Sequence, residues 1–195
     1  MYSKDDQAKL SIEGHVLIKD VDTNEVLLDK FNAINFENMA VAIAHLLANQ
    51  TDNGNGYYIA RMAFGRGGTV IDSNGNISYK LPKVDGTQGD LYEPLMGSGL
   101  TRFEKAISSF EIPEADSQQY RDLTSVVVLN YNEPADAMQL DTASDFDDAE
   151  SYVFDELALV GDNGNFLTHL IFHPIQKSLN RKLEVRYTLR IRAGS

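Results

Sequence analysis

The sequence predicts a mainly β protein, an antiparallel β-sandwich with one packed α-helix and long loops. Two observations favour this fold class. Apolar runs separated by turn-forming residues fill segment 152–192, and the last run, 183–192, alternates apolar with polar side chains. Helical spacing of apolar residues is confined to segment 36–48. At 195 residues the chain can bury a core without disulfides, so we expect one domain spanning 1–195.

A predicted hairpin opens the chain. Segment 10–19 alternates apolar with polar residues, segment 21–25 has turn composition, and segment 26–31 returns as the partner strand. Gly14 interrupts the first strand, so we expect a bulge or a close approach of another group at that position.

The predicted helix spans 36–48. Asn35 is suited to cap its N-terminus, and Glu37 lies in the first turn, where the helix dipole favours a negative charge. Apolar residues at helical spacing predict the side of the helix that packs on the sheet. They are Phe36, Met39, Ala40, Ile43, Leu46 and Leu47.

Two glycine-containing turns follow a short predicted strand at 57–64. The first, 65–69, does not have the spacing of a phosphate-binding loop and is interpreted as a structural turn or tight strand crossing, with an anion-binding backbone nest as the alternative. The second, 72–76, matches the first half of a calcium loop but lacks its glycine and its final glutamate, so a hairpin turn is favoured.

Two long loops are predicted in the middle of the chain. Segment 81–125 is expected to be an extended excursion that wraps a neighbour or covers a sheet edge, and its Leu91, Tyr92 and Phe103 are candidate interface residues. A strand at 123–131 resumes the sheet. Segment 133–150 is an acidic loop without Lys or Arg that is either solvated or meets a positive surface. Its Asp145, Asp147 and Asp148 are candidate interface residues, and together with Asp141 they are the best candidates for calcium binding.

The chain closes with a predicted hairpin, 154–160 and 166–173, joined by the turn 161–165, and with the strand 183–192. Arg186, Arg190 and Arg192 share the outward face of that last strand. Because like charges on one face repel, we expect acidic partners, and the acidic loop of a neighbouring copy is the candidate. The alternatives are an edge strand protected by charge, or pairing with the same loop within one chain.

The charge of the chain excludes some function classes. A net charge of −12 opposes binding to nucleic acid and to anionic membranes. The chain has no cysteine and therefore no disulfide or thiolate site. Segment 1–7 has no apolar core and no stretch reaches the length of a membrane span, so neither a secretion signal nor a transmembrane helix is expected.

Catalytic motifs are missing from the sequence. His169 and His173 would be about 13 Å apart along a strand, too far to share a metal ion. No nucleophile elbow or metalloprotease motif is present. The sequence therefore predicts no enzyme, no cofactor and no metal.

Three stretches of the chain resemble a family of tailed-bacteriophage virion structural proteins: 19–35 running into the helix, 62–69, and 155–159 with 167–177. The closing hairpin with strand 183–191 also resembles phage tail-collar and tail-fibre anchoring domains. The resemblance covers both ends of the chain but not segment 82–150. It implies a non-enzymatic protein of the tail, neck or baseplate, located in the virion and assembled in the host cytoplasm with other virion proteins and copies of itself. A capsid decoration protein is the alternative within this class. Outside it, the alternatives are a carbohydrate- or calcium-binding module and a hydrolase.

Overall fold

The computed structural model describes residues 9–86, 89–94, 103–114, 120–134 and 151–194. The predicted fold class is confirmed, because the described residues form antiparallel strands and one helix. The strands are β1 (Lys9–Asp20), β2 (Val26–Ile34), β3 (Ile59–Arg66), β4 (Thr69–Ile71), β5 (Ile77–Tyr79), β6 (Glu93–Pro94), β7 (Phe103–Ala106), β8 (Ser109–Glu111), β9 (Tyr120–Leu129), β10 (Ser151–Gly161), β11 (Thr168–Ser178) and β12 (Leu183–Gly194). The helix is α1 (Phe36–Leu47).

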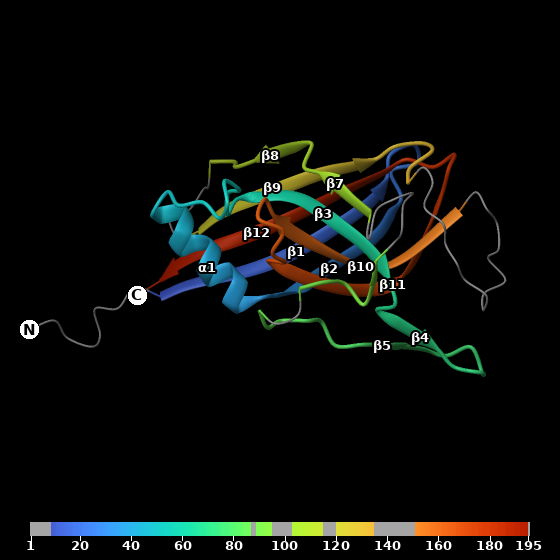
Figure 1. Ribbon diagram of the computed structural model, residues 1–195. Coiled ribbons are helices and arrows are strands. Elements are labelled where there is room, and N and C mark those ends of the chain that lie inside the picture. Colours follow the sequence, from blue (N-terminus) through green and yellow to red (C-terminus); the bar gives the residue numbers. More distant parts are fainter. Residues whose placement is uncertain (1–8, 87–88, 95–102, 115–119, 135–150, 195) are drawn as a thin grey trace, which may run out of the picture.

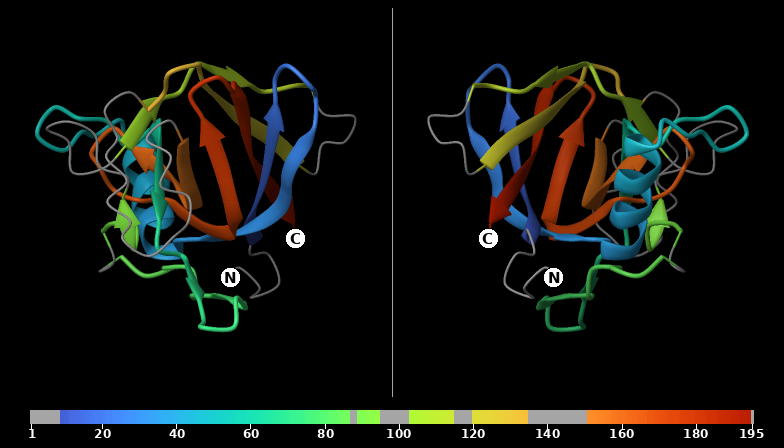
Figure 2. Two further views of the ribbon diagram at one scale, coloured as in Figure 1. Left: turned by 90° about the vertical axis from the view of Figure 1, so that its right-hand side faces the viewer. Right: turned by 90° about the vertical axis from the view of Figure 1, so that its left-hand side faces the viewer.

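Ten of these strands form a curled sheet with the order β6-β3-β10-β11-β2-β1-β12-β9-β8, in which β7 also pairs with β3. Seen along the strands, the sheet curls around an interior (Figure 2). Its two halves face each other as in a sandwich and are joined by a short pairing of β11 with β2 at Thr168↔Ile34 and His169↔Ala33. The separate β4–β5 hairpin projects from the body at the end far from α1 (Figure 1).

The consecutive strands β7 and β8 connect the two ends of this curled sheet. β7 pairs with β3, whereas β8 pairs with β9. Between them, the Ile107 amide donates to the Ala60 carbonyl and the Ser108 amide donates to the Val126 carbonyl. Segment 103–111 therefore spans from one edge of the sheet to the other.

The first and last predicted hairpins are confirmed. β1 pairs with β2 and β10 pairs with β11, each antiparallel. Gly14 is a point of close approach, because a Cβ there would lie 1.6 Å from the Asn32 side-chain oxygen. The β1–β2 irregularity itself lies further on, between Ile18 and Lys19. β12 is a central strand between β1 and β9, so the interpretation of the last strand as a sheet edge is wrong.

The core lies between the two halves of the sheet. The inward residues of β12, from Leu183 to Leu189, are at most 3 % exposed, as the alternation of the sequence predicts. They meet the aromatic side chains of the opposite half, where Phe154 packs edge-to-face against both Phe64 and Phe172.

Helix α1 begins at Phe36 as predicted, with the Asn35 side chain accepting from the Asn38 amide, and it ends at Leu47, one residue earlier than predicted. It lies at the end of the molecule where β1 begins and β12 ends (Figure 1). The predicted packing face is partly wrong. Met39 and Ala42 are the buried residues, whereas Phe36 is 71 % and Leu47 is 84 % exposed. Within the described residues, no helix has the length and apolarity needed to cross a membrane.

Candidate functional site

The three arginines of the proposed interface are already paired within the chain. Arg190 binds Asp122 on β9 through two hydrogen bonds, of 2.8 Å from Nε and 2.7 Å from one terminal nitrogen. This bond lowers the pKa of Asp122 and raises that of Arg190. Arg186 binds Glu111 on β8, and Arg192 binds Glu13 on β1 at 3.2 Å.

The premise that these arginines need an acidic partner from outside is therefore wrong. Their carboxylates come from neighbouring strands, which the sequence could not reveal before the strand order was known. The partners also differ from the acidic loop that we expected. Asp145, Asp147 and Asp148 of that loop lie outside the described residues, so the contact between copies through this loop stays a prediction.

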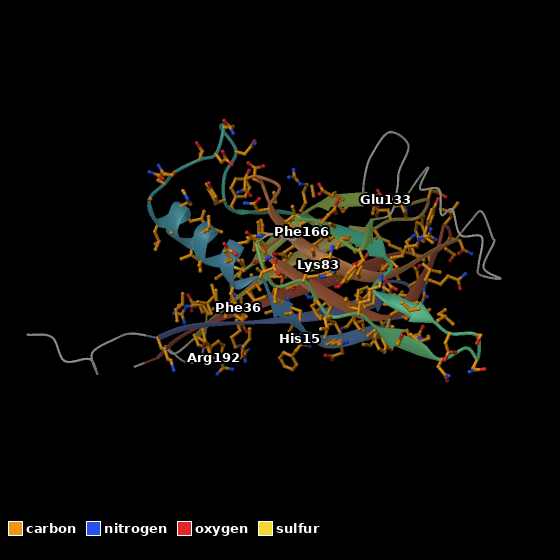
Figure 3. The ribbon with its side chains drawn as sticks, turned by 60° about the horizontal axis from the view of Figure 1, so that its bottom comes forward. His15, Phe36, Lys83, Glu133, Phe166 and Arg192 are labelled. Atoms are coloured by element: carbon orange, nitrogen blue, oxygen red, sulfur yellow. The ribbon has the colours of Figure 1, made fainter. Side chains whose placement is uncertain are left out.

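A polar hollow of about 380 Å³ lies beside Arg190, and its lining includes Glu13, His15 and Phe31. Figure 3 shows His15 and Arg192 on the same side of the molecule. Polar side chains at the hollow bind partners within the chain, since His15 lies 2.6 Å from Asp29 and Arg190 binds Asp122. These bonds would have to be exchanged for hydroxyl contacts before the hollow could hold a sugar.

Segment 81–125 differs from the expected loop excursion, because its described parts contain β6, β7, β8 and the first residues of β9. Phe103 on β7 packs against the core, with its ring centroid 5.9 Å from that of Phe64. Leu91 is 3 % exposed and belongs to a second apolar cluster. Of the three candidate interface residues, Tyr92 is the most exposed in the monomer, at 38 %.

Tyr92 and Lys83 are fixed by a buried carboxylate–imidazole pair. The Tyr92 amide donates to Glu156 at 3.0 Å, and the Lys83 amide donates to His169 Nδ1 at 2.9 Å. Because Nδ1 accepts this bond, the His169 proton is on Nε2, which lies 3.0 Å from the Glu156 carboxylate. Both side chains are at most 2 % exposed. The pair attaches a surface segment to β10 and β11.

The glycine turn at 65–69 is structural, as interpreted, and its amides already bind an anion from the same chain. The Asp155 carboxylate accepts from the amides of Gly68 at 2.9 Å and Thr69 at 2.8 Å, and from the Thr69 hydroxyl. A Cβ on Gly68 would lie 2.9 Å from the Ile171 side chain, so the close packing requires glycine here. The alternative of a site for an external anion at this turn is therefore excluded.

Turn 72–76 joins β4 to β5 as a hairpin turn, which confirms that prediction. Asp72 accepts from the Asn74 and Asn76 amides and from the Asn76 side chain, which lowers its pKa. Across the described parts of the chain, no three His, Asp or Glu side chains lie close enough together to hold a metal ion. The candidate calcium ligands in segment 141–148 lie outside the described residues, so calcium binding there stays a prediction.

A buried lysine lies where the acidic loop leaves the sheet. Lys177 donates to the carbonyls of Asn130 at 2.9 Å and Ser178 at 3.0 Å, and burial lowers its pKa to about 8. Glu133 binds Lys105 and accepts from the Asn130 amide. Figure 3 shows Glu133 far from α1. These contacts hold the start of the loop on β7, β9 and β11.

An exposed apolar surface that the sequence pattern placed against the sheet is the outer face of α1. It consists of Phe36, Ala40, Ala44 and Leu47, all exposed, and it is bordered by the exposed Glu37 and Val41. Positions 36, 40, 44 and 47 follow helical spacing, so the sequence did indicate that these residues share one side of the helix. Since the inner side of α1 is apolar too, sequence pattern alone could not tell which side packs on the sheet.

Comparisons with protein-family models, with curated proteins and with solved structures find no match.

Proposed function

We propose that this chain is a non-enzymatic structural subunit of a tailed-bacteriophage virion, in the tail, neck or baseplate, and that it assembles through protein–protein contacts. The observation that carries the assembly role is the outer face of α1. An exposed helix that is apolar on both sides is typical of a helix that is covered in the assembled state. The virion setting is supported by the resemblance of segments 19–35, 62–69, 155–159 and 167–177 to phage structural proteins.

A second copy of the chain is the occupant that this face fits. Large side chains, Phe36 and Leu47, lie at its two ends, and the small Ala40 and Ala44 lie between them. In an antiparallel pair of α1 helices, Phe36 of one copy would face Leu47 of the other, and the alanines would allow close approach at the centre. Such a contact is self-complementary, as a two-fold symmetric interface requires.

The expected strength of this contact is low. Burying Phe36 and Leu47 of both copies contributes about 2 kcal/mol for each side chain. Loss of translational and rotational freedom offsets at least about 4 kcal/mol of that sum. The helix pair alone would therefore associate weakly, and stable incorporation would depend on several contacts made at once in the particle.

The test uses a charge-introducing double variant, Phe36→Glu with Leu47→Glu. A matched control is Val70→Glu with Ile71→Glu, since Val70 is 50 % and Ile71 is 58 % exposed on the distant β4–β5 hairpin. Because a net gain of about 4 kcal/mol corresponds to a dissociation constant near 1 mM, the measurement is made at protein concentrations up to about 1 mM. There we expect sedimentation velocity to show a concentration-dependent dimer for the natural chain and for the control, but a monomer for the α1 variant. Unchanged circular dichroism would show that the variant is folded.

The virion role has its own readout. The protein should be found by mass spectrometry in purified particles of the phage that encodes it, in stoichiometric amounts. A copy number in the tens or below would fit the tail, neck or baseplate, whereas hundreds of copies would fit capsid decoration. Absence from purified particles, or an α1 variant that dimerises as well as the natural chain, would contradict the proposal.

A further inference from the structure

An apolar pocket lies beneath α1, on the side of the helix that carries Met39, Ala42 and Ile43. Its volume is about 230 Å³. It is closed on one side by α1 and on the others by the ends of β1, β3, β8, β9 and β12. The lining residues are Ile12, Met39, Ala42, Ile43, Leu46, Tyr57, Tyr58, Ile59, Phe110, Leu123, Leu167, Leu189 and Ile191.

The pocket reaches from the surface into the core. At its floor, Leu167 and Leu189 are each 3 % exposed, and so is Ala42. Around its opening, Leu46 and Phe110 are about half exposed, at 51 % and 48 %. A solute could therefore enter from the solvent and lose most of its own contact with water.

The chemistry of the lining selects against water and against charge. No lining side chain is ionisable near neutral pH, and the polar atoms of these side chains are two tyrosine hydroxyls. A buried water needs two to four polar partners, so this lining binds water only weakly. A charged group would lose its hydration without compensation, and an anion would also be repelled by the net charge of −12.

The size of the pocket bounds the ligand. A cavity of roughly 150 Å³ with an apolar lining holds one benzene molecule. By the same ratio, about 230 Å³ holds a molecule of about nine or ten carbon atoms. One wall is pre-formed, because the Tyr57 ring stacks on His45 with centroids 4.2 Å apart and planes 7° apart.

We infer that this pocket is a binding site for a small, neutral, apolar molecule, of the size of a two-ring aromatic hydrocarbon or a short alkyl chain. The ligand would contact Met39, Ala42 and Ile43 on the inner side of α1 and Leu189 and Ile191 on β12. It would thereby hold the helix on the sheet. The inference stands independently of the proposed virion role, since it concerns the inner side of α1.

Naphthalene is a suitable probe, with 2-naphthalenesulfonate as its charged counterpart. We expect calorimetry to show saturable binding of naphthalene to one site on the full chain, and at least tenfold weaker binding of the sulfonate. Ala42→Phe should fill the pocket and weaken binding at least tenfold. Ala44→Phe makes the same change on the exposed side of the same helix and should leave binding unchanged.

A direct readout avoids dependence on the folding of the variants. In the natural chain labelled at methyl groups, naphthalene should shift the resonances of Met39, Ile43 and Ile191 and leave that of Ile71 on the β4–β5 hairpin in place. The inference would be overturned by any of three results: no saturable binding up to the solubility limit, full binding by folded Ala42→Phe, or loss of binding in Ala44→Phe.

Discussion

Buried polar side chains of this protein bind backbone groups of distant segments and thereby fix where those segments lie. Asp155 holds the turn between β3 and β4, Lys177 holds the end of β9, and Asn35 donates to the Asp85 carbonyl while capping α1. A buried donor or acceptor without a partner is costly, so each of these residues specifies one arrangement of its segment.

The first prediction concerns Asp155. Asp155→Ala leaves two amides and a hydroxyl without their acceptor, and we expect a loss of about 3 kcal/mol in the free energy of unfolding, measured by urea denaturation. Asp72→Ala is the matched control, because Asp72 also accepts three hydrogen bonds but lies at an exposed hairpin tip. The two variants should differ clearly, and equal losses would mean that burial is not the cause.

The second prediction concerns Lys177, whose pKa falls from 10.5 to about 8 in the folded protein. Between these two pH values the unfolded chain binds more protons than the folded chain, so stability rises as pH increases through this window. Relative to Lys177→Met, the natural protein should gain about 2 kcal/mol from pH 7.5 to pH 10 in urea titrations. Lys9→Met is the control. Because Lys177 is intact in this variant, its free energy of unfolding should rise with pH as in the natural protein. A flat difference across this range would contradict the burial of a charged lysine.

At the scale of single residues, the sequence predicted the direction in which a side chain points better than it predicted the residue to which that side chain binds. The outward orientation of the β12 arginines followed from alternation alone. Their partners Asp122, Glu111 and Glu13 did not, because they depend on the order and register of β1, β9 and β8 beside β12. The buried Glu156–His169 pair was missed for the same reason: the two residues are thirteen positions apart on different strands.

At the scale of elements, the hairpins and the helix could be predicted, since periodicity and capping are local properties. The orientation of α1 could not. Apolar residues lie on more than one side of α1, so the side that is buried depends on where the helix packs on the sheet. The short strands β6, β7 and β8 were also missed, because two to four residues of mixed polarity carry no periodic signal.

The third prediction tests how strongly β12 and β9 are joined by side chains. A double-mutant cycle with Arg190→Ala and Asp122→Ala should give a coupling energy of about 1 kcal/mol, near the upper end for partly exposed pairs, because the contact has two hydrogen bonds.

The same cycle with Arg192→Ala and Glu13→Ala is the control. That pair has a single bond of 3.2 Å with both side chains about half exposed, and its coupling should be smaller. Equal coupling energies in the two cycles would show that the bidentate geometry contributes nothing.

At the scale of the whole molecule, the net charge of −12 gives opposite salt dependences for the two proposed contacts between copies, one through α1 and one through the β12 arginines. Pairing through the apolar outer face of α1 is opposed by long-range repulsion, so it should strengthen when salt screens that repulsion. Pairing of arginines with an acidic loop should weaken with salt instead.

The fourth prediction follows from this difference. The dimer dissociation constant, measured by sedimentation at 50 mM and 500 mM sodium chloride, should be lower at the higher salt concentration. The α1 variant Phe36→Glu with Leu47→Glu should remain monomeric at both. A dissociation constant that rises with salt would favour the arginine contact over the helix contact.

Segment 103–111 affects how copies of this chain could meet. Through β7 it pairs with Arg61–Phe64 of β3, and through β8 it pairs with Thr124–Val126 of β9. Along these stretches the hydrogen-bonding edge is used within the chain, so a strand from a neighbouring copy could be added there only if this segment detached. Contacts between copies at these stretches would therefore be made by side chains.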